Sequence, residues 1–268
     1  MSMNYKRNRT QCYIEGQIGI LNTGGLKSKK QEFKNYSLND IDVINIDEII
    51  QKDALDHYYS GIISIADGMN SLIERKYSWA TVKLYYGIYY LLRATLGLNK
   101  YSILYNGEYY SLKNEKFEKP KEIKNKRNTH NATIYFFINH FKTYDYLLSN
   151  EINGKNTYIW MMEAREITNY RSCSFMEPMF HDFWEKIDKN NNKEGLQDII
   201  ENIYNQPDLF CFQEEYAIVA IPIKRLLLTT NLFQKFKIIN KMKDYKMEYI
   251  EKILFFKSVD INLFKILF

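Results

Sequence analysis

Glycine and proline are scarce in this chain, which has 11 and 4 of them among 268 residues. A β-sandwich or a nucleotide-binding α/β fold uses many glycines in tight turns, so the scarcity argues against both folds and favours long helices. Four glycines, Gly16, Gly19, Gly24 and Gly25, lie close together, but their surroundings match neither G-x-x-x-x-G-K-[ST] nor G-x-G-x-x-G. We interpret this cluster as turns and not as a phosphate-binding loop.

Cysteines and long apolar runs are scarce as well. Cys12, Cys173 and Cys211 are widely spaced and form no C-x-x-C, so neither a disulfide framework nor a zinc site is expected. H-E-x-x-H and G-x-S-x-G do not occur in the sequence, and we expect no metal and no cofactor. The polar start of the chain and the lack of an apolar run of about 18 residues predict a soluble, cytoplasmic protein without a membrane partner.

The positive charge is concentrated in two segments, although the net charge is only +5. Residues 1–34 contain seven basic residues against two acidic ones, and residues 113–127 contain seven against three. The bases of the second segment are Lys113, Lys116, Lys119, Lys121, Lys124, Lys126 and Arg127. Basic loops attract phosphate backbones through counterion release. A solvated loop has the same composition, so both interpretations stay open.

The spacing of apolar residues predicts a mainly α protein built around a helical bundle. Residues 53–76 have apolar side chains three and four positions apart, which indicates an amphipathic helix. Residues 77–98 predict the next helix, which Ser78 can cap and which Gly97 would end in a left-handed conformation. Gly87 in its interior indicates a close crossing of the two helices, because glycine otherwise weakens a helix.

More helices are expected further along the chain. Helical spacing resumes after Thr129 and continues to about residue 147, and another helix is expected over residues 156–171. Pro178 fits the first turn of the helix that follows. Residues 189–268 predict a helical C-terminal extension with helices over 195–205, 208–233 and 234–256, the second of them interrupted by Pro222.

Two segments break the helical pattern. Residues 1–52 form an N-terminal segment that we expect to be irregular or short-stranded. Within it, acidic and aliphatic residues alternate over residues 37–50, which fits a short strand or a lead-in helix. Residues 101–112 predict a small β-hairpin, because Asn106-Gly107 is typical of a type I′ turn. The domain prediction is therefore an N-terminal segment (1–52), a helical body with a hairpin insertion (53–188) and the extension (189–268).

The last residues, 259–268, are apolar to the end of the sequence. Chain ends are usually polar and frayed, so this stretch predicts docking into the body of the protein or onto another subunit. Two pairs of neighbouring carboxylates, Glu214 with Glu215 and Asp40 with Asp42, have no motif around them. We interpret both pairs as surface charge.

The order of the central elements resembles a known superfamily. A long helix is followed by a tyrosine-rich helix (YYGIYYLLRA), an insertion, another helix and an arginine-bearing helix that reads NTYIWMMEAREITNYR. This order resembles the HEPN superfamily (higher eukaryotes and prokaryotes nucleotide-binding domains) over residues 53–188, about half of the chain. The resemblance implies a helical bundle of the kind found in toxin–antitoxin modules, CRISPR effectors and phage-defence systems.

The resemblance also implies a ribonuclease motif, which this sequence matches only in part. Active members cut RNA without metal through an R-x4-6-H pair with a polar residue after the arginine. Arg165 and Glu166 match the first two positions, but the places for histidine hold Tyr170, Arg171 and Ser172. Histidine is needed there because it transfers protons near neutral pH, whereas the reference pKa of tyrosine is about 10.

The four histidines of the chain lie elsewhere, at His57, His130, His140 and His181. His181, on the following helix, is the only one near enough in sequence to substitute. We therefore expect that metal-free ribonuclease activity is lost, while Arg165, Asn169 and Arg171 stay candidates for binding phosphate or nucleotide. The alternative is that Arg165 pairs with a nearby glutamate or a neighbouring helix and only closes the bundle.

Three functional hypotheses follow. The favoured one is a non-catalytic accessory or scaffold subunit of a prokaryotic defence or toxin-type complex, which binds a protein from the same operon and in some cases nucleic acid. The second is a ribonuclease with an altered catalytic set of Arg165, Tyr170 and His181. The third is a nucleic-acid sensor that uses the basic loop at 113–127 and the N-terminal segment. A homodimer is compatible with all three.

Overall fold

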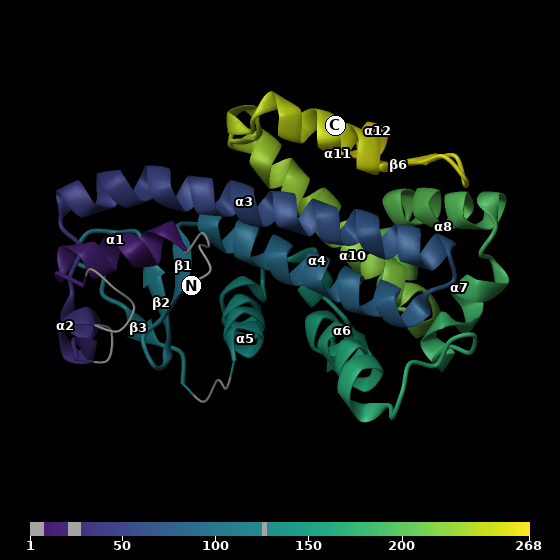
Figure 1. The fold of residues 1–268 in the computed structure, drawn as a ribbon, viewed down its shortest axis with the longest axis horizontal. Helices are drawn as coiled ribbons and strands as arrows, with labels where there is room; N and C mark the ends of the chain where they lie inside the picture. Colours follow the sequence, from purple (N-terminus) through teal and green to yellow (C-terminus); the bar gives the residue numbers. More distant parts are fainter. Residues whose placement is uncertain (1–7, 21–27, 125–127) are drawn as a thin grey trace, which may run out of the picture. The chain divides into compact units, whose positions relative to one another are not determined.

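The computed structural model describes residues 8–20, 28–124 and 128–268 and confirms a mainly α protein (Figure 1). The chain forms two compact units, one from residues 1–57 and 92–137 and the other from residues 58–91 and 138–268. Helices α3 (Asp40–Ile73) and α4 (Tyr77–Leu98) contribute residues to both units. The predicted boundaries at 52/53 and 188/189 therefore do not coincide with these units.

The first unit combines helices with a small antiparallel sheet. Its strands pair in the order β1-β2-β3, with Leu104 of β1 opposite Tyr110 of β2. Besides the parts of α3 and α4, its elements are α1 (Arg9–Gln17), α2 (Lys30–Asn35), β1 (Tyr101–Tyr105), β2 (Tyr109–Lys113), β3 (Lys121–Glu122) and most of α5 (Thr129–Phe141). The core residues come from the helices, from the connection between α2 and α3 and from one face of the sheet: Ile14, Phe33, Leu38, Ile46, Ile50, Leu104, Tyr110 and Leu112.

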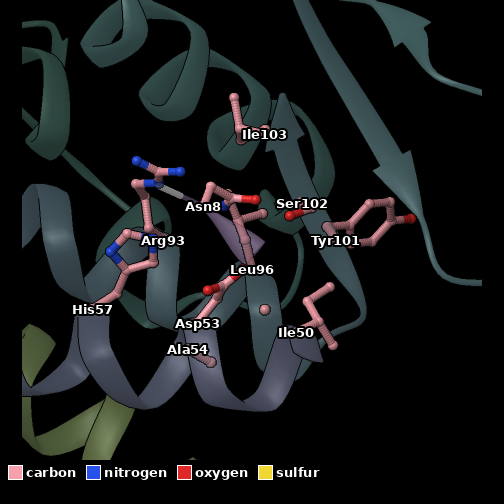
Figure 2. A pocket seen from close by; sticks show the side chains of 11 residues that line it. Asn8, Ile50, Asp53, Ala54, His57, Arg93, Leu96, Tyr101, Ser102 and Ile103 are labelled. Atoms are coloured by element: carbon pink, nitrogen blue, oxygen red, sulfur yellow. The ribbon is translucent and has the colours of Figure 1, made fainter. Parts of the chain in front are cut away.

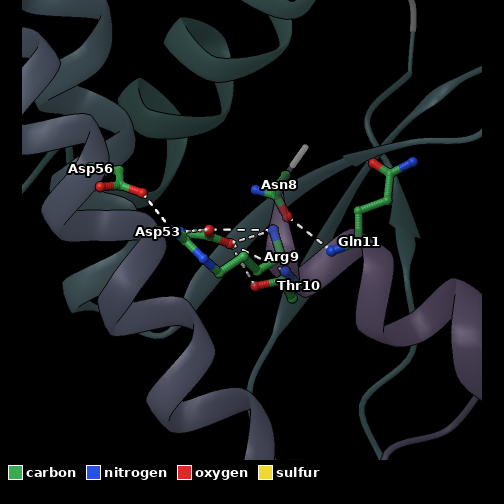
Figure 3. Close-up of polar contacts among 6 residues, drawn as sticks. All are labelled: Asn8, Arg9, Thr10, Gln11, Asp53 and Asp56. Carbon is green, nitrogen blue, oxygen red and sulfur yellow. Dashed lines mark hydrogen bonds and ion pairs between the residues drawn. The ribbon is translucent and has the colours of Figure 1, made fainter. Parts of the chain in front are cut away.

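The N-terminal segment contains the helices α1 and α2, so the expectation of an irregular or short-stranded start is wrong for residues 9–17 and 30–35. The first turn of α1 depends on a distant carboxylate, because Asp53 accepts the backbone N–H groups of Arg9 (3.0 Å) and Thr10 (3.1 Å). Asn8 caps the same turn by accepting the N–H of Gln11, as Figure 3 shows. Gly24 and Gly25 lie outside the described residues.

Helix α3 begins at Asp40, so residues 40–50 form part of a long helix and not a strand. Asn39 and Asp42 form a reciprocal capping box, in which each side chain accepts the backbone N–H of the other residue (2.9 and 3.0 Å). Asp42 also accepts the hydroxyls of Tyr13 and Tyr36 (both 2.9 Å). Asp42 is buried, so its interpretation as surface charge is wrong.

Two turn predictions differ from the structure in the first unit. The connection from β1 to β2 has Gly107 at positive φ (77°), whereas Asn106 is not among the described residues with positive φ, so the turn is not of type I′. Gly97 does not end α4 in a left-handed conformation, because Lys100 takes that role (φ 66°). A Cβ on Gly97 would lie 2.9 Å from the Cβ of Ala54, so this glycine permits close packing of α4 on α3.

The second unit is built from helices and two short hairpins. Before its π-helical turn it contains η2 (Tyr146–Leu148), β4 (Glu151–Ile152), β5 (Lys155–Asn156) and α6 (Thr157–Glu166). The turn η3 (Ile167–Arg171) is followed by η4 (Asp182–Trp184), α7 (Glu185–Lys189), α8 (Lys193–Asn205), α9 (Pro207–Phe210) and α10 (Glu214–Lys235). The end of the chain contains η5 (Ile239–Lys241), α11 (Asp244–Ile253), β6 (Phe255–Phe256), β7 (Ile261–Asn262) and α12 (Leu263–Leu267).

Helices α3 and α4 cross closely in the second unit, as Gly87 predicted. A Cβ on Gly87 would lie 2.5 Å from Cγ1 of Ile65, and one on Gly61 would lie 2.8 Å from the side chain of Leu91. A methyl group at either position would force Ile65 or Leu91 to shift. The glycines therefore set the distance between the two helices.

Helix α10 is long and apolar enough to span a membrane, but 72% of its most apolar window is buried inside the protein. This burial is that of a core helix. Pro222 lies inside α10 and does not divide it, contrary to expectation. On the same helix the buried guanidinium of Arg225 donates to Asp145 and to the hydroxyl of Tyr158 (3.1 Å).

Two other helix boundaries differ from the prediction. Helix α5 ends at Phe141, well before residue 147. Pro178 does not start a helix, because the next helical turn begins at Asp182. The apolar end of the chain packs on its own unit, where Leu263 and Leu267 are buried and Gln234 donates to the carbonyl of Leu267 (3.0 Å).

Candidate functional site

Arg165 lies in the last turn of α6, and only 6% of its surface is exposed. Its guanidinium carbon is 4.8 Å from the ring centre of Tyr85 on α4 and 5.3 Å from that of Tyr170 on η3. Tyr85 is fully buried, whereas 72% of Tyr170 is exposed. The cation is thus held between an inner and an outer phenol ring. We call Arg165, Tyr85 and Tyr170 the arginine clamp.

The π-helical turn explains how Tyr170 reaches Arg165. The N–H of Ser172 bonds to the carbonyl of Ile167, five residues earlier (3.0 Å). With i→i+5 bonding, a residue five positions along the chain returns close to the same face of the helix. In an α-helix, residues three and four apart share a face, so Tyr170 would point away from Arg165. A local change of helix type therefore completes the clamp.

Arg165 has no carboxylate partner within the part of the chain that the structure describes. The nearby glutamates pair with other bases, since Glu163 binds Lys155 (2.6 Å) and Glu166 binds Arg171 (3.6 Å). The Nε of Arg165 is buried without a hydrogen-bond partner. Pairing of Arg165 with one of these glutamates is therefore not observed, whereas its packing on the neighbouring helix α4, through Tyr85, is.

Tyr85 keeps its proton at neutral pH. Burial raises the pKa of its hydroxyl to about 12, although the guanidinium of Arg165 acts in the opposite direction. A neutral phenol can offer its ring face to the cation but does not neutralise the charge. The clamp consequently carries a full positive charge in a mostly enclosed place.

Of the other predicted site residues, Asn169 and Arg171 lie on η3 with Tyr170, whereas His181 lies beyond it in the chain. Asn169 is half-buried on η3 and Arg171 is exposed there. His181 stacks on Phe183 with ring centres 5.4 Å apart. Burial lowers the pKa of His181, and the charged groups that act on it are Asp182 and Glu177, not Arg165. The structure therefore brings Tyr170 to Arg165 but does not bring His181 there.

The basic loop is largely neutralised by its own acids and by α3. Lys113 pairs with Glu115 (2.5 Å), Lys121 with Glu118 (2.7 Å) and Lys116 with Asp40 (2.7 Å). Lys119 and Lys124 have no ion pair among the described residues, and Lys126 and Arg127 lie outside them. The lysines that the structure describes thus form a weaker basic surface than the sequence predicts.

A cavity in the first unit groups charged residues that sequence reasoning did not connect. His57 and Arg93 lie side by side at its wall, and Asp53 and Ser102 line it as well (Figure 2). Burial and the charge of Arg93 lower the pKa of His57 well below its ordinary value. The cavity volume is about 10 Å³, which is close to the minimum for one water molecule. Asp53 is already occupied by Arg9 and Thr10 (Figure 3), so we assign this cavity a structural role.

Sequence reasoning missed Tyr85, the ring on α4 that lies against Arg165, and a ring pair at the start of α4. Trp79 on α4 and Phe175 form an edge-to-face pair with centres 5.2 Å apart. The sequence indicated these residues only through the many aromatic side chains in residues 77–98. Such a density is equally typical of a hydrophobic core. The described residues contain no group of three or more His, Cys, Asp or Glu side chains that could hold a metal ion.

Comparison of the chain with protein-family models, with curated proteins and with solved structures found no match.

Proposed function

We propose that this chain is a non-catalytic helical accessory subunit of a multiprotein complex and that Arg165 anchors an anionic group of its partner. The observation that carries the proposal is the enclosed guanidinium with two aromatic neighbours and no carboxylate partner among the described residues. Arginine recognises carboxylates and phosphates through paired hydrogen bonds, which makes it a suitable anchor.

The energy of the clamp favours an incoming anion. Moving a charge out of water costs several kcal/mol even after relaxation. A cation–π contact contributes about 0.5–2 kcal/mol, so the rings of Tyr85 and Tyr170 offset only part of that cost. An anion that reaches the remaining exposed edge of Arg165 would compensate the rest of this desolvation cost.

Binding fits this geometry better than proton transfer does. The proton of Tyr85 is held by burial, and the aromatic and charged neighbours of His181 do not include Arg165. A ribonuclease built on Arg165, Tyr170 and His181 would need these groups to converge on one phosphate. This is why the accessory role is proposed ahead of the ribonuclease.

Two further parts of the proposal rest on the resemblance to the HEPN superfamily. They are the prokaryotic defence or toxin-type setting in the cytoplasm, and nucleic acid as a second source of the anionic group at Arg165, Asn169 and Arg171. The apolar C-terminal stretch adds no support for a partner, because Leu263 and Leu267 pack inside the chain.

The test is co-expression with the products of the neighbouring genes, followed by the measurement of molar mass by light scattering and of RNA degradation. We expect co-migration with a neighbouring product and no cleavage by the isolated chain. Arg165→Gln should abolish co-migration, whereas Lys189→Gln, which removes an exposed cation paired with Glu185, should not. RNA cleavage by the isolated chain that disappears in Arg165→Gln would establish the ribonuclease instead, and absence of co-migration would refute the accessory role.

A further inference from the structure

Exposed apolar side chains lie on the same segments as the arginine clamp, namely on α4 and on the residues that follow η3. Trp79, Phe175 and Met179 are exposed by 47%, 43% and 67% of their surface, and Tyr170 forms the outer wall of the clamp. The segment that carries Phe175 is tied to the start of α4, because Glu177 accepts the N–H (2.7 Å) and the hydroxyl (2.8 Å) of Ser78. We call Trp79, Tyr170, Phe175 and Met179 the aromatic face.

The charges around the aromatic face are mostly compensated. Lys83 on α4 pairs with Asp67 (3.4 Å), and Arg171 pairs with Glu166 (3.6 Å). Glu177 adds a further negative charge beside Trp79. Nucleic acid requires a surplus of positive charge along its backbone, and this surface has little. Among the described residues of this region, Arg165 is the cation without a carboxylate partner. It therefore offers a single positive charge, which suits one anionic group.

We propose that the aromatic face docks a segment of a partner protein in which a single carboxylate stands among apolar side chains. The carboxylate pairs with Arg165, and the apolar side chains cover Trp79, Phe175 and Met179. Tryptophan, tyrosine and arginine are the residues that most often dominate binding energy at protein interfaces. This inference rests on the proposed accessory function and specifies the chemistry of its partner.

Tyr170 controls access to the cation in this arrangement. Its ring covers Arg165 from the outside, and its exposed position lets the side chain rotate without disturbing the core. A docked carboxylate displaces the ring from the outer side of the guanidinium, and the ring then packs against the apolar side chains of the partner. The inner ring of Tyr85 stays in place because it is fully buried.

The experiment is a selection of random dodecapeptides on phage against the immobilised full-length chain. The selected peptides are then synthesised with a fluorescent label, and their affinity is measured by anisotropy beside that of a labelled mixed-sequence single-stranded RNA. We expect peptides with one Asp or Glu next to Trp, Phe, Leu or Met. Their affinity should fall about tenfold or more, which corresponds to about 1.4 kcal/mol, in Trp79→Ala and in Arg165→Gln.

Tyr144→Ala is the matched control, since this tyrosine is more exposed than any residue of the aromatic face (86%) and stands outside it. It should leave the affinity unchanged. Trp79→Ala changes an exposed side chain, so it keeps the test valid even if Arg165→Gln fails to fold. Replacement of the peptide carboxylate by its amide should weaken binding to the unmodified chain and have no effect in Arg165→Gln.

Three outcomes would overturn the inference: no enriched peptides, enriched peptides without an acid, or affinity that Trp79→Ala does not change. RNA that binds the unmodified chain and is lost in Trp79→Ala would assign the face to nucleic acid. Co-migration with a neighbouring gene product that persists in Trp79→Ala would refute this docking surface and leave the accessory role standing. Absence of co-migration together with the expected peptides would refute the accessory role alone.

Discussion

Arg225 and Arg165 are both buried in the second unit, but their charges have different surroundings. Arg225 donates to the carboxylate of Asp145, whereas Arg165 lies against the phenols of Tyr85 and Tyr170 and has no carboxylate partner among the described residues. Removal of one member of a buried ion pair strands the other, which costs about 3–5 kcal/mol. An unpaired buried cation leaves no stranded partner when it is replaced by an apolar side chain of similar volume.

We therefore predict that Arg225→Met lowers the free energy of unfolding by about 3–5 kcal/mol. Arg165→Met is expected to change it by less than about 1 kcal/mol or to raise it. Urea unfolding followed by circular dichroism measures both. An equal loss in the two variants would show that Arg165 has an essential partner in the folded chain.

His57 supplies a pH prediction. Its pKa in the folded chain lies well below the ordinary value, mainly through burial and then through Arg93; Asp56 acts in the opposite direction, and Arg9 adds a smaller lowering effect. The unfolded chain consequently binds more protons once the pH falls below about 6.5. The stability contribution is complete above that pH and is lost as the pH falls towards the folded pKa.

The free energy of unfolding changes by at most about 1.4 kcal/mol per pH unit through the titration of His57 alone. Urea midpoints measured at a series of pH values below 7 should decrease in the unmodified chain. They should decrease less steeply in His57→Asn, which has no titrating group at this position. The same slope in both proteins would assign the pH dependence to other groups.

At the scale of the elements, the start of α3 depends on one carboxylate. Asp42 accepts two tyrosine hydroxyls and the N–H of Asn39. Asp42→Ala should therefore lower the free energy of unfolding by about 2–3 kcal/mol. Asp40→Ala is the control, since its exposed side chain pairs with Lys116 on the surface, and it should stay within about 0.5 kcal/mol. Thermal or urea unfolding that gave equal losses would contradict this difference.

The crossing of α3 and α4 depends on the absence of side chains at its glycines. In Gly87→Ala the new methyl would meet Cγ1 of Ile65, close to the backbone, where little adjustment is available. Overpacking costs about 1–3 kcal/mol and outweighs the gain in helix propensity of about 1 kcal/mol, so a net loss of up to about 2 kcal/mol is expected.

Gly16→Ala is the matched test on α1, because no atom of the described residues lies within 4 Å of the added methyl. It should raise the free energy of unfolding by about 0.5–1 kcal/mol. Unfolding curves of both variants decide the point. Stabilisation by Gly87→Ala would mean that the helices separate at little cost.

Element types were predictable where the apolar spacing was long and regular, as in α4 and α8. The π-helical turn was not predictable, because ITNYR contains nothing that separates it from the end of an α-helix. Helix α1 was missed for a related reason. Its first N–H groups are satisfied by Asp53, 43 residues away from Thr10, and such a partner is invisible in the local sequence.

At the scale of the whole molecule, the compensation of its charges sets the salt dependence of binding. Three lysines of the loop at 113–127 are paired, and the clamp offers one charge. We predict that the affinity for the partner falls less than about fourfold between 50 and 200 mM salt, as expected for a single ionic contact. A nucleic-acid sensor with many phosphate contacts would lose about a thousandfold or more. Anisotropy titrations at the two concentrations distinguish these cases.

The sequence by itself determined that the protein is mainly helical, because helical periodicity and the lack of glycine are local properties of the chain. It also singled out Arg165 and the missing histidine after it. The tertiary structure decided the surroundings of that arginine: its nearby glutamates pair with other bases, two phenol rings lie against its guanidinium, and His181 stacks on Phe183. The inner ring depends on residues that are distant in sequence, Tyr85 and Arg165, which the packing of α6 on α4 brings together.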